Sequence, residues 1–409
     1  MEQTLRNYLI VTGGYWAFTI TDGAIRMLVV LYFYQLGYSP FEVAMLFLFY
    51  EFFGIVTNLA GGWLAARIGL NLTMNIGMAL QVLALAMLTV PDAWLSVAYV
   101  MTAQALSGIA KDLNKMSAKA SVKSISGNRA SHARLFQWVA ILTGSKNALK
   151  GGGFFVGAAL LEGVGFRGAL ATLAGLLFMV LIITAMLLPA GMGKMKSKPR
   201  FTQVFSTVPA INWLSAARFF LFGARDVWFV VALPVFLVSV LHWSFTAAGA
   251  FMALWVIGYG LVQAVAPRLL RHRRHGHGPG GGMARFLAFA LTLVPAAIAL
   301  GLHQKLPADQ VLILGLMLFG VLFALNSAVH SYLILAYSDH ERVTMNVGFY
   351  YMANAGGRLA GTVLSGLTYQ HLGLTGCLWL SSLFVLAAAL LSLRLPEVPT
   401  FAAPESASD

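Results

Sequence analysis

The stretch LFQWVAILTGSKNALKGGGFFVGAALLE, at residues 135–162, is the best guide to the architecture of this chain. It is apolar over most of its length and long enough for a helix to cross about 30 Å of hydrocarbon. Lys146 and Lys150 nevertheless lie one helical turn apart in its middle. A charge inside a bilayer costs roughly 2.5–3.5 kcal/mol on insertion scales, so such charges persist mainly where they face a cavity, a partner or a substrate. The stretch therefore predicts a membrane-spanning helix with a polar role.

The composition of the whole chain also indicates a membrane protein. Of its 409 residues, 59% are hydrophobic and only 10% are charged, whereas a soluble domain carries about 25% charged residues. The single cysteine, Cys377, excludes a disulfide within the chain. The first apolar run, at about 9–34, is too long for the core of a cleavable signal peptide.

Apolar runs long enough to span a bilayer recur along the entire chain. They predict an all-α membrane protein with twelve transmembrane helices. The predicted spans are 9–34, 41–66, 73–91, 93–116, 135–162, 169–189, 210–241, 244–266, 284–302, 310–336, 345–370 and 376–395. Because the number is even, both termini are expected on one side of the membrane.

The distribution of lysine and arginine predicts which side that is. Segments after the even-numbered spans carry Arg67, Lys119, Lys123, Arg129, Arg134, Lys194, Lys196, Lys198, Arg200, Arg268, Arg271, Arg273 and Arg274. Segments after the odd-numbered spans carry only Arg167 and Lys305. Cytoplasmic loops are enriched in positive charge, so both termini are expected in the cytoplasm. These loops account for most of the net charge of +13 without invoking a nucleic-acid partner.

A faint internal repeat divides the chain into two halves. Asp22 precedes Ser39 at the start of the second span, as Asp226 precedes Ser244 at the start of the eighth. We expect a six-helix bundle at 1–190, a basic cytoplasmic linker at 191–209, a second bundle at 210–396 and a cytoplasmic tail at 397–409. Two pseudo-symmetric six-helix bundles resemble the major facilitator fold, in which substrate binds near the midplane between the halves.

The loop after the second span points to the same superfamily. Gly62, Arg67 and Gly69 match the signature loop of major facilitator transporters, which takes part in gating. Ala66 stands where that loop usually has an aspartate, so its usual contact between helices is in question. The alternative is a simple tight turn that ends at Gly69.

Positive charges outnumber negative ones inside the predicted spans. The basic residues are Arg26, Lys111, Lys115, Lys146, Lys150, Arg218, Arg225 and Arg358, and the acids are Asp22, Glu51, Asp112 and Asp226. The surplus is four positive charges. It falls to three if Lys111, Asp112 and Lys115 reach the cytoplasmic interface. Either value indicates an anionic substrate.

Seven of the polar residues in the spans are candidate substrate ligands. They are Arg26, Arg225, Lys146, Lys150, Arg358, Asn147 and Asn354. Arg26 and Arg225 occupy the equivalent first and seventh spans, and a guanidinium presents a planar fork to an oxyanion. Lys146 and Lys150 share one face of the fifth span, and Arg358 is the expected counterpart in the eleventh. Asn147 and Asn354 gain weight from their positions beside Lys150 and Arg358.

Structural roles compete with these assignments. Asp22 and Arg26 are four residues apart, which suits an ion pair within one helix. The lysines of the fifth span need either a bound anion or carboxylates from another helix. Asp22, Glu51 and Asp226 are each candidates for ion pairing or for proton coupling. Arg218 is a weaker candidate ligand because it lies nearer the expected cytoplasmic end of its span.

Three blocks carry a closer resemblance. Residues 15–29 (YWAFTITDGAIRMLV), 104–117 (QALSGIAKDLNKMS) and 142–152 (LTGSKNALKGG) are similar to the organoarsenical efflux permeases. That resemblance implies a bacterial inner-membrane exporter of 1-arseno-3-phosphoglycerate, which confers arsenate resistance. It also implies a functional link to glyceraldehyde-3-phosphate dehydrogenase, which makes the compound from arsenate. One basic cluster near Arg26 and Arg225, and another near Lys146, Lys150 and Arg358, would each hold one end of this anion.

Other functions remain open at this stage. The chain could carry another organophosphate or organic anion, act on anionic lipid as a membrane-embedded enzyme, or serve as a receptor without transport. No phosphate-binding loop, catalytic triad or dinucleotide fingerprint occurs in the sequence, so we expect no enzyme activity, cofactor or metal. Proton antiport, phosphate exchange and facilitated exit are all compatible with the sequence. A monomer is the usual state in this superfamily.

Overall fold

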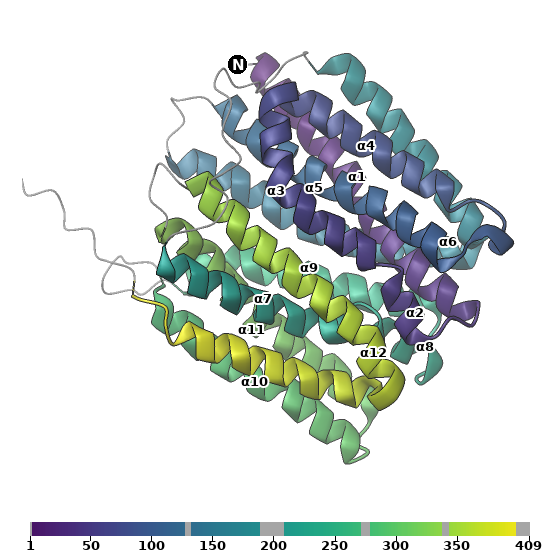
Figure 1. Cartoon of the computed structure of the whole chain (residues 1–409), viewed down its shortest axis with the longest axis vertical. Helices are drawn as coiled ribbons and strands as arrows, with labels where there is room; N and C mark the ends of the chain where they lie inside the picture. Colours follow the sequence, from purple (N-terminus) through teal and green to yellow (C-terminus); the bar gives the residue numbers. More distant parts are fainter. Residues whose placement is uncertain (1, 127–131, 189–207, 271–278, 338–342, 398–409) are drawn as a thin grey trace, which may run out of the picture.

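The computed structural model describes residues 2–126, 132–188, 208–270, 279–337 and 343–397, and all regular elements in these ranges are helices (Figure 1). The predicted linker at 191–209 and tail at 397–409 lie almost wholly outside the described residues. The start of α1 and the end of α12 lie at the same end of the molecule. This placement matches an even number of membrane crossings.

In the first half of the chain, the described residues form one 3-10 turn and six α-helices. They are α1 (Glu2–Gln35), α2 (Pro40–Met45), α3 (Leu48–Ile68), α4 (Leu70–Met87), η1 (Asp92–Trp94), α5 (Val97–Ser126) and α6 (His132–Leu187). The second half contains α7 (Pro209–Phe229), α8 (Ala232–Ser239), α9 (Phe245–Leu269), α10 (Gly281–His303), α11 (Ala308–Ala336) and α12 (Val343–Ser392).

The predicted all-helical membrane fold is confirmed, with changes at several span boundaries. The predicted second span is divided into α2 and α3, and the seventh into α7 and α8. The fifth and sixth spans join in α6, which kinks at Gly165 (φ 74°), and the last two join in α12 at Gly373 (φ 63°). Glycine adopts positive φ at little cost, so each pair reverses direction without a longer loop.

Short-range signals start the equivalent helices in the two halves. The Ser39 hydroxyl accepts a hydrogen bond from the Glu42 backbone N–H, and the Glu42 carboxylate accepts one from the Ser39 backbone N–H. The Ser244 hydroxyl accepts a bond from the Ala247 N–H at the start of α9. Such caps satisfy backbone donors that the first turn of a helix leaves unpaired. The repeated serines noted in the sequence are therefore helix starts.

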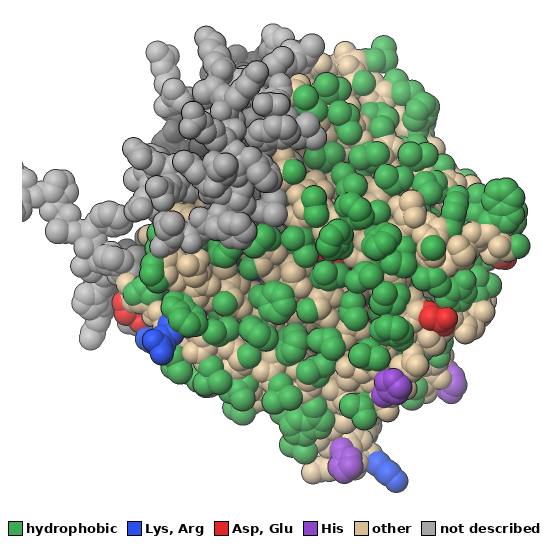
Figure 2. All heavy atoms as spheres, in the orientation of Figure 1, with side chains coloured by type: hydrophobic (Ala, Val, Ile, Leu, Met, Phe, Trp, Pro, Cys, Tyr) green, Lys and Arg blue, Asp and Glu red, His purple; other side chains and the backbone are tan. Residues whose placement is uncertain are grey.

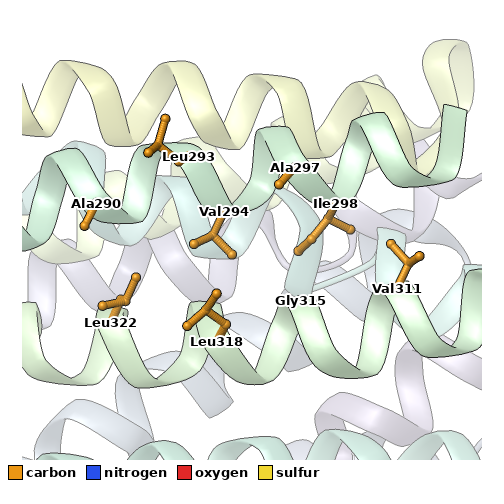
Figure 3. A pocket seen from close by; sticks show the side chains of 9 residues that line it. All are labelled: Ala290, Leu293, Val294, Ala297, Ile298, Val311, Gly315, Leu318 and Leu322. Atoms are coloured by element: carbon orange, nitrogen blue, oxygen red, sulfur yellow. The ribbon is translucent and has the colours of Figure 1, made fainter. Parts of the chain in front are cut away.

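The outer surface is suited to lipid. Figure 2 shows a face covered mainly by hydrophobic side chains, with the charged ones near its edges. A hollow of about 420 Å³ between α10 and α11 is lined only by apolar residues and glycine, including Leu293 and Leu318 (Figure 3). Both leucines are exposed. In a membrane such a hollow faces acyl chains.

The two halves repeat one packing arrangement and meet along two seams. Helix α1 packs on α6 in the first half, and α7 packs on α12 in the second. Between the halves, α2 and α3 contact α12, and α6 contacts α9. At the end away from the termini, the Phe41 N–H donates to Gln370, and Thr246 donates to Glu162. These bonds join the halves at the end that the sequence predicts to be external.

Candidate functional site

A cavity of about 180 Å³ lies between the two halves. Its lining includes all eight basic residues that the sequence places within membrane spans, namely Arg26, Lys111, Lys115, Lys146, Lys150, Arg218, Arg225 and Arg358. Among the described residues, Asp112 is the one carboxylate in that lining. The other three acids of the spans, Asp22, Glu51 and Asp226, are buried behind the cations. The wall presented to a solute is therefore strongly cationic.

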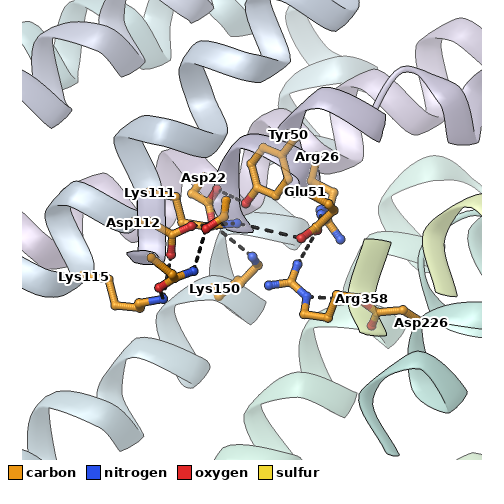
Figure 4. Close-up of polar contacts among 12 residues, drawn as sticks. Asp22, Arg26, Tyr50, Glu51, Lys111, Asp112, Lys115, Lys150, Asp226 and Arg358 are labelled. Atoms are coloured by element: carbon orange, nitrogen blue, oxygen red, sulfur yellow. Dashed lines mark hydrogen bonds and ion pairs between the residues drawn. The ribbon is translucent and has the colours of Figure 1, made fainter. Parts of the chain in front are cut away.

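Glu51 on α3 joins arginines from both halves (Figure 4). Its Oε1 lies 2.7 Å from Arg26 on α1 and 2.5 Å from Arg358 on α12, and its Oε2 lies 4.0 Å from Lys111. Glu51 is fully buried. Because removing one partner of a buried ion pair leaves an uncompensated charge, this contact ties the halves together near the middle of the fold.

The sequence predicts an ion pair between Asp22 and Arg26 within α1. In the structure, neither residue has the other as its main partner. Arg26 instead reaches Glu51, and Asp22 contacts Lys150 of α6 at 2.9 Å. The Tyr50 hydroxyl donates to the second oxygen of Asp22 at 2.6 Å. The packing of α1 against its neighbours therefore overrides the favourable local spacing of the sequence.

The second half contains an equivalent acid–cation pair. Asp226 of α7 lies 3.2 Å from Arg358 of α12, as Asp22 of α1 lies near Lys150 of α6. Asp226 also lies 2.5 Å from its neighbour Arg225. In both halves, the glycine three residues after the cation meets the backbone of the acid's helix: Gly153 meets α1, and Gly361 meets α7. A side chain at either glycine would separate the helices.

Lys111, Asp112 and Lys115, which the sequence allows to reach the cytoplasmic interface, line the cavity. Asp112 lies 2.6 Å from Lys115 and 3.7 Å from Lys111. Lys111 also lies 4.0 Å from the centre of the Tyr50 ring, a favourable distance for a cation–π contact. All eight cations therefore count toward the charge of the site, against four carboxylates, which leaves four positive charges.

Arg218 is the cavity residue whose importance the sequence understated. Its guanidinium donates to Asn354 Oδ1 at 2.9 Å and to Ser327 Oγ at 3.1 Å, and lies 3.8 Å from the Phe222 ring centre. Among the described residues it forms no ion pair with a carboxylate. Its full positive charge therefore remains available to an anion. The occurrence of Arg218 seven residues before Arg225, on one face of α7, was the available sequence signal.

The remaining candidate ligands lie at or near the same cavity. Asn147 donates to Gln263 of α9 at 3.0 Å, so it helps to join the halves, and Asn354 is occupied by Arg218. Lys146 lines the cavity. The lysines of the site come from α5 and α6, whereas the basic residues that α7 and α12 contribute are all arginines. This division differs from the expected grouping of Arg358 with the lysines.

The gating-loop candidates lie where α3 meets α4. Gly62 and Arg67 belong to α3, and the side chain of Arg67 is outside the described part of the chain. Gly69 lies between the helices with φ 97°. Glycine adopts this conformation at little cost, so Gly69 is suited to a tight turn between the two helices. The gating role stays a prediction.

A cationic cavity between two repeated sets of apolar helices is the arrangement of a membrane transporter for a solute. The chain belongs to the Major Facilitator Superfamily, whose family model matches residues 11–303 and 219–408. This is a superfamily of transporters rather than enzymes, and the protein is a multi-pass membrane protein.

Solved structures support the fold assignment. One comes from a study of substrate recognition in proton-dependent oligopeptide transporters and has a TM-score of 0.71 and 15% identity. The match covers 95% of this chain and 97% of the chain in that structure. A mutant of the nucleoside transporter NupG has a TM-score of 0.70 and 15% identity. The match covers 96% of this chain and 98% of the NupG chain. At such identity the likeness concerns the fold alone. No curated protein sequence matches the chain.

Proposed function

We propose that this protein exports an organic polyanion, 1-arseno-3-phosphoglycerate, from the cytoplasm and thereby confers arsenate resistance. The observation that carries the anion specificity is the cavity lined by eight cations and one carboxylate. The particular compound rests on the resemblance of residues 15–29, 104–117 and 142–152 to organoarsenical efflux permeases.

The charge distribution suits an anion with two different ends. The compound carries a phosphate at one end and an arsenate ester at the other. Arginines can hold a tetrahedral oxyanion through paired N–H groups, whereas lysines act as flexible point charges. In the proposed binding mode, Arg218 and Arg225 hold one end while Lys146 and Lys150 hold the other. Arg358, which pairs with Glu51 and Asp226, changes partner when substrate enters.

The cellular setting follows from the same proposal. The protein lies in the bacterial inner membrane as a monomer, with both termini in the cytoplasm and the linker at 191–209 between bundles at 1–190 and 210–396. Glyceraldehyde-3-phosphate dehydrogenase supplies the substrate from arsenate. The export step removes it before arsenate is released again inside the cell.

Everted membrane vesicles test this function. Arsenate, glyceraldehyde-3-phosphate, NAD and the dehydrogenase are supplied outside, and arsenic accumulated inside is measured. Uptake that needs every component supports export of the arsenylated glycerate. Uptake without the dehydrogenase means that arsenate itself is carried. No uptake into vesicles that contain folded protein rejects this substrate.

An organic anion with an apolar group is the second candidate. Phe154, Phe222, Phe229, Trp255 and Tyr259 also line the cavity. Some of this aromatic surface supports arginines, as Phe222 does for Arg218. The rest offers more apolar contact than a phosphorylated glycerate needs. Competition by aromatic carboxylates or phosphates for arsenical uptake separates the two candidates.

A further inference from the structure

We propose that the transporter works as an obligatory anion exchanger, which carries a small inorganic oxyanion of the phosphate class inward for each organic anion that it releases. This inference rests on the proposed function, because it concerns the same cationic cavity. It specifies the anion that the cavity must bind before it can return to face the cytoplasm.

The carboxylates of the site are all engaged with cations. Glu51 holds Arg26 and Arg358, and Asp112 holds Lys115. Asp22 pairs with Lys150 and also accepts a hydrogen bond from the Tyr50 hydroxyl, while Asp226 pairs with Arg225 and Arg358. Protonation of any of them would remove the partner of at least one buried cation. Proton coupling through these groups therefore conflicts with the charges that surround them.

His330 is another buried titratable side chain near this network. It lies on α11, is 1% exposed, and does not belong to the lining of the cavity. Arg218, whose charge acts on it, lies on α7. A proton added at His330 would increase the positive surplus of the site. It would not compensate the cations.

The empty site keeps a positive surplus that its own acids do not balance. Even without Lys146, seven cations of the cavity face four carboxylates. Closing an empty site would enclose these charges at membrane depth, where uncompensated charge is costly. A bound polyanion removes that cost in the loaded state. The loaded form therefore reorients readily, and the empty form does not, because only the loaded form is compensated.

The returning anion must satisfy the same groups. Arg218 and Arg225 lie on one face of α7 and present N–H donors to the cavity. A doubly charged tetrahedral oxyanion matches such donors and neutralises about half of the surplus of four. Inorganic phosphate has this chemistry, and arsenate is isosteric with it. Chloride carries one charge and lacks the two oxygens that match the paired N–H groups of a guanidinium.

Exchange is tested with the purified full-length protein in liposomes, using radiolabelled inorganic phosphate as the probe. Uptake is compared between liposomes filled with phosphate and liposomes filled with chloride, with and without a protonophore. We expect uptake at least about tenfold faster into phosphate-filled liposomes and no effect of the protonophore. Arg218→Gln should lower this exchange, whereas Lys305→Gln, at an exposed loop position, should not.

Three results would overturn the inference. Equal uptake into chloride-filled liposomes means uniport, and collapse of uptake by the protonophore means proton coupling. Absence of phosphate movement, when arsenical uptake into everted vesicles succeeds, rejects the counter-anion but leaves the proposed function intact. Conversely, phosphate exchange by a protein that fails the vesicle assay supports the exchange mechanism and rejects the proposed substrate.

Discussion

Asp22 and Lys150 are 128 positions apart in the chain, yet their charged groups lie 2.9 Å apart between α1 and α6. Asp226 and Arg358 form the same kind of pair between α7 and α12. Each half therefore contains an equivalent pair of a cavity cation and a buried carboxylate. Glu51 then links the halves, because it contacts both Arg26 and Arg358.

The Asp22–Lys150 pair makes a prediction about stability. Lys150→Met leaves Asp22 buried with the Tyr50 hydroxyl as its main remaining contact. Breaking one side of a buried pair costs roughly 3–5 kcal/mol, so we expect a clear fall in the thermal unfolding temperature in detergent. The double variant Asp22→Asn/Lys150→Met should recover most of the loss while remaining inactive. A double variant as unstable as the single one would show that the pair is not the cause.

Arg218 makes a prediction about transport with stability preserved. In Arg218→Gln, the new amide can still donate to Asn354 or Ser327, so the protein should fold. Loss of the unpaired charge should lower transport roughly 10–100-fold, since a hydrogen bond to a charged group contributes about 1.5–3 kcal/mol. Arg218→Lys should recover only part of the rate because it lacks the fork. Unchanged transport in Arg218→Gln would remove this residue from the site.

Two adjacent glycines provide a matched pair of variants in α6. A methyl group at Gly153 would meet the backbone of α1, whereas one at Gly152 would have nothing within 4 Å. Gly153→Ala should destabilise the protein by about 1–3 kcal/mol through overpacking. Gly152→Ala should be neutral or slightly stabilising, because alanine favours helix by up to about 1 kcal/mol. The thermal unfolding temperatures of the two purified variants are compared. Equal unfolding temperatures would contradict the close approach of α1 and α6.

The contact between Phe41 and Gln370 predicts where the transporter must open. Cysteines at these two positions, in a chain that carries Cys377→Ala, should be joined by a short cleavable cross-linker. We expect the cross-link to stop transport and a reducing agent to restore it, because the two halves must separate at this end to release substrate. Each single-cysteine variant treated in the same way is the control. Full transport by the cross-linked protein would place the opening elsewhere.

Much of the site was accessible from local patterns in the chain. The basic residues of the spans were recognised as a group, and all of them line one cavity. Their partners were harder to foresee. The spacing of Asp22 and Arg26 favoured a pair within one helix, whereas Arg26 contacts Glu51 of α3. The sequence makes Arg218 a weaker candidate because its depth in the membrane depends on how α7 packs among its neighbours.

Amino-acid order alone was enough to establish a membrane protein, its helical segments and the sign of its charge surplus. Those properties depend on the transfer free energy of each residue and on contacts a few positions apart. The pairing of each acid with a cation depended on the packed fold. It is set by the rotation and separation of helices that lie far apart in the chain, and close approach at Gly153 and Gly361 brings α1 to α6 and α7 to α12. The packed fold thus decides whether a basic residue pairs with a carboxylate or, as at Arg218, is free to bind an anion.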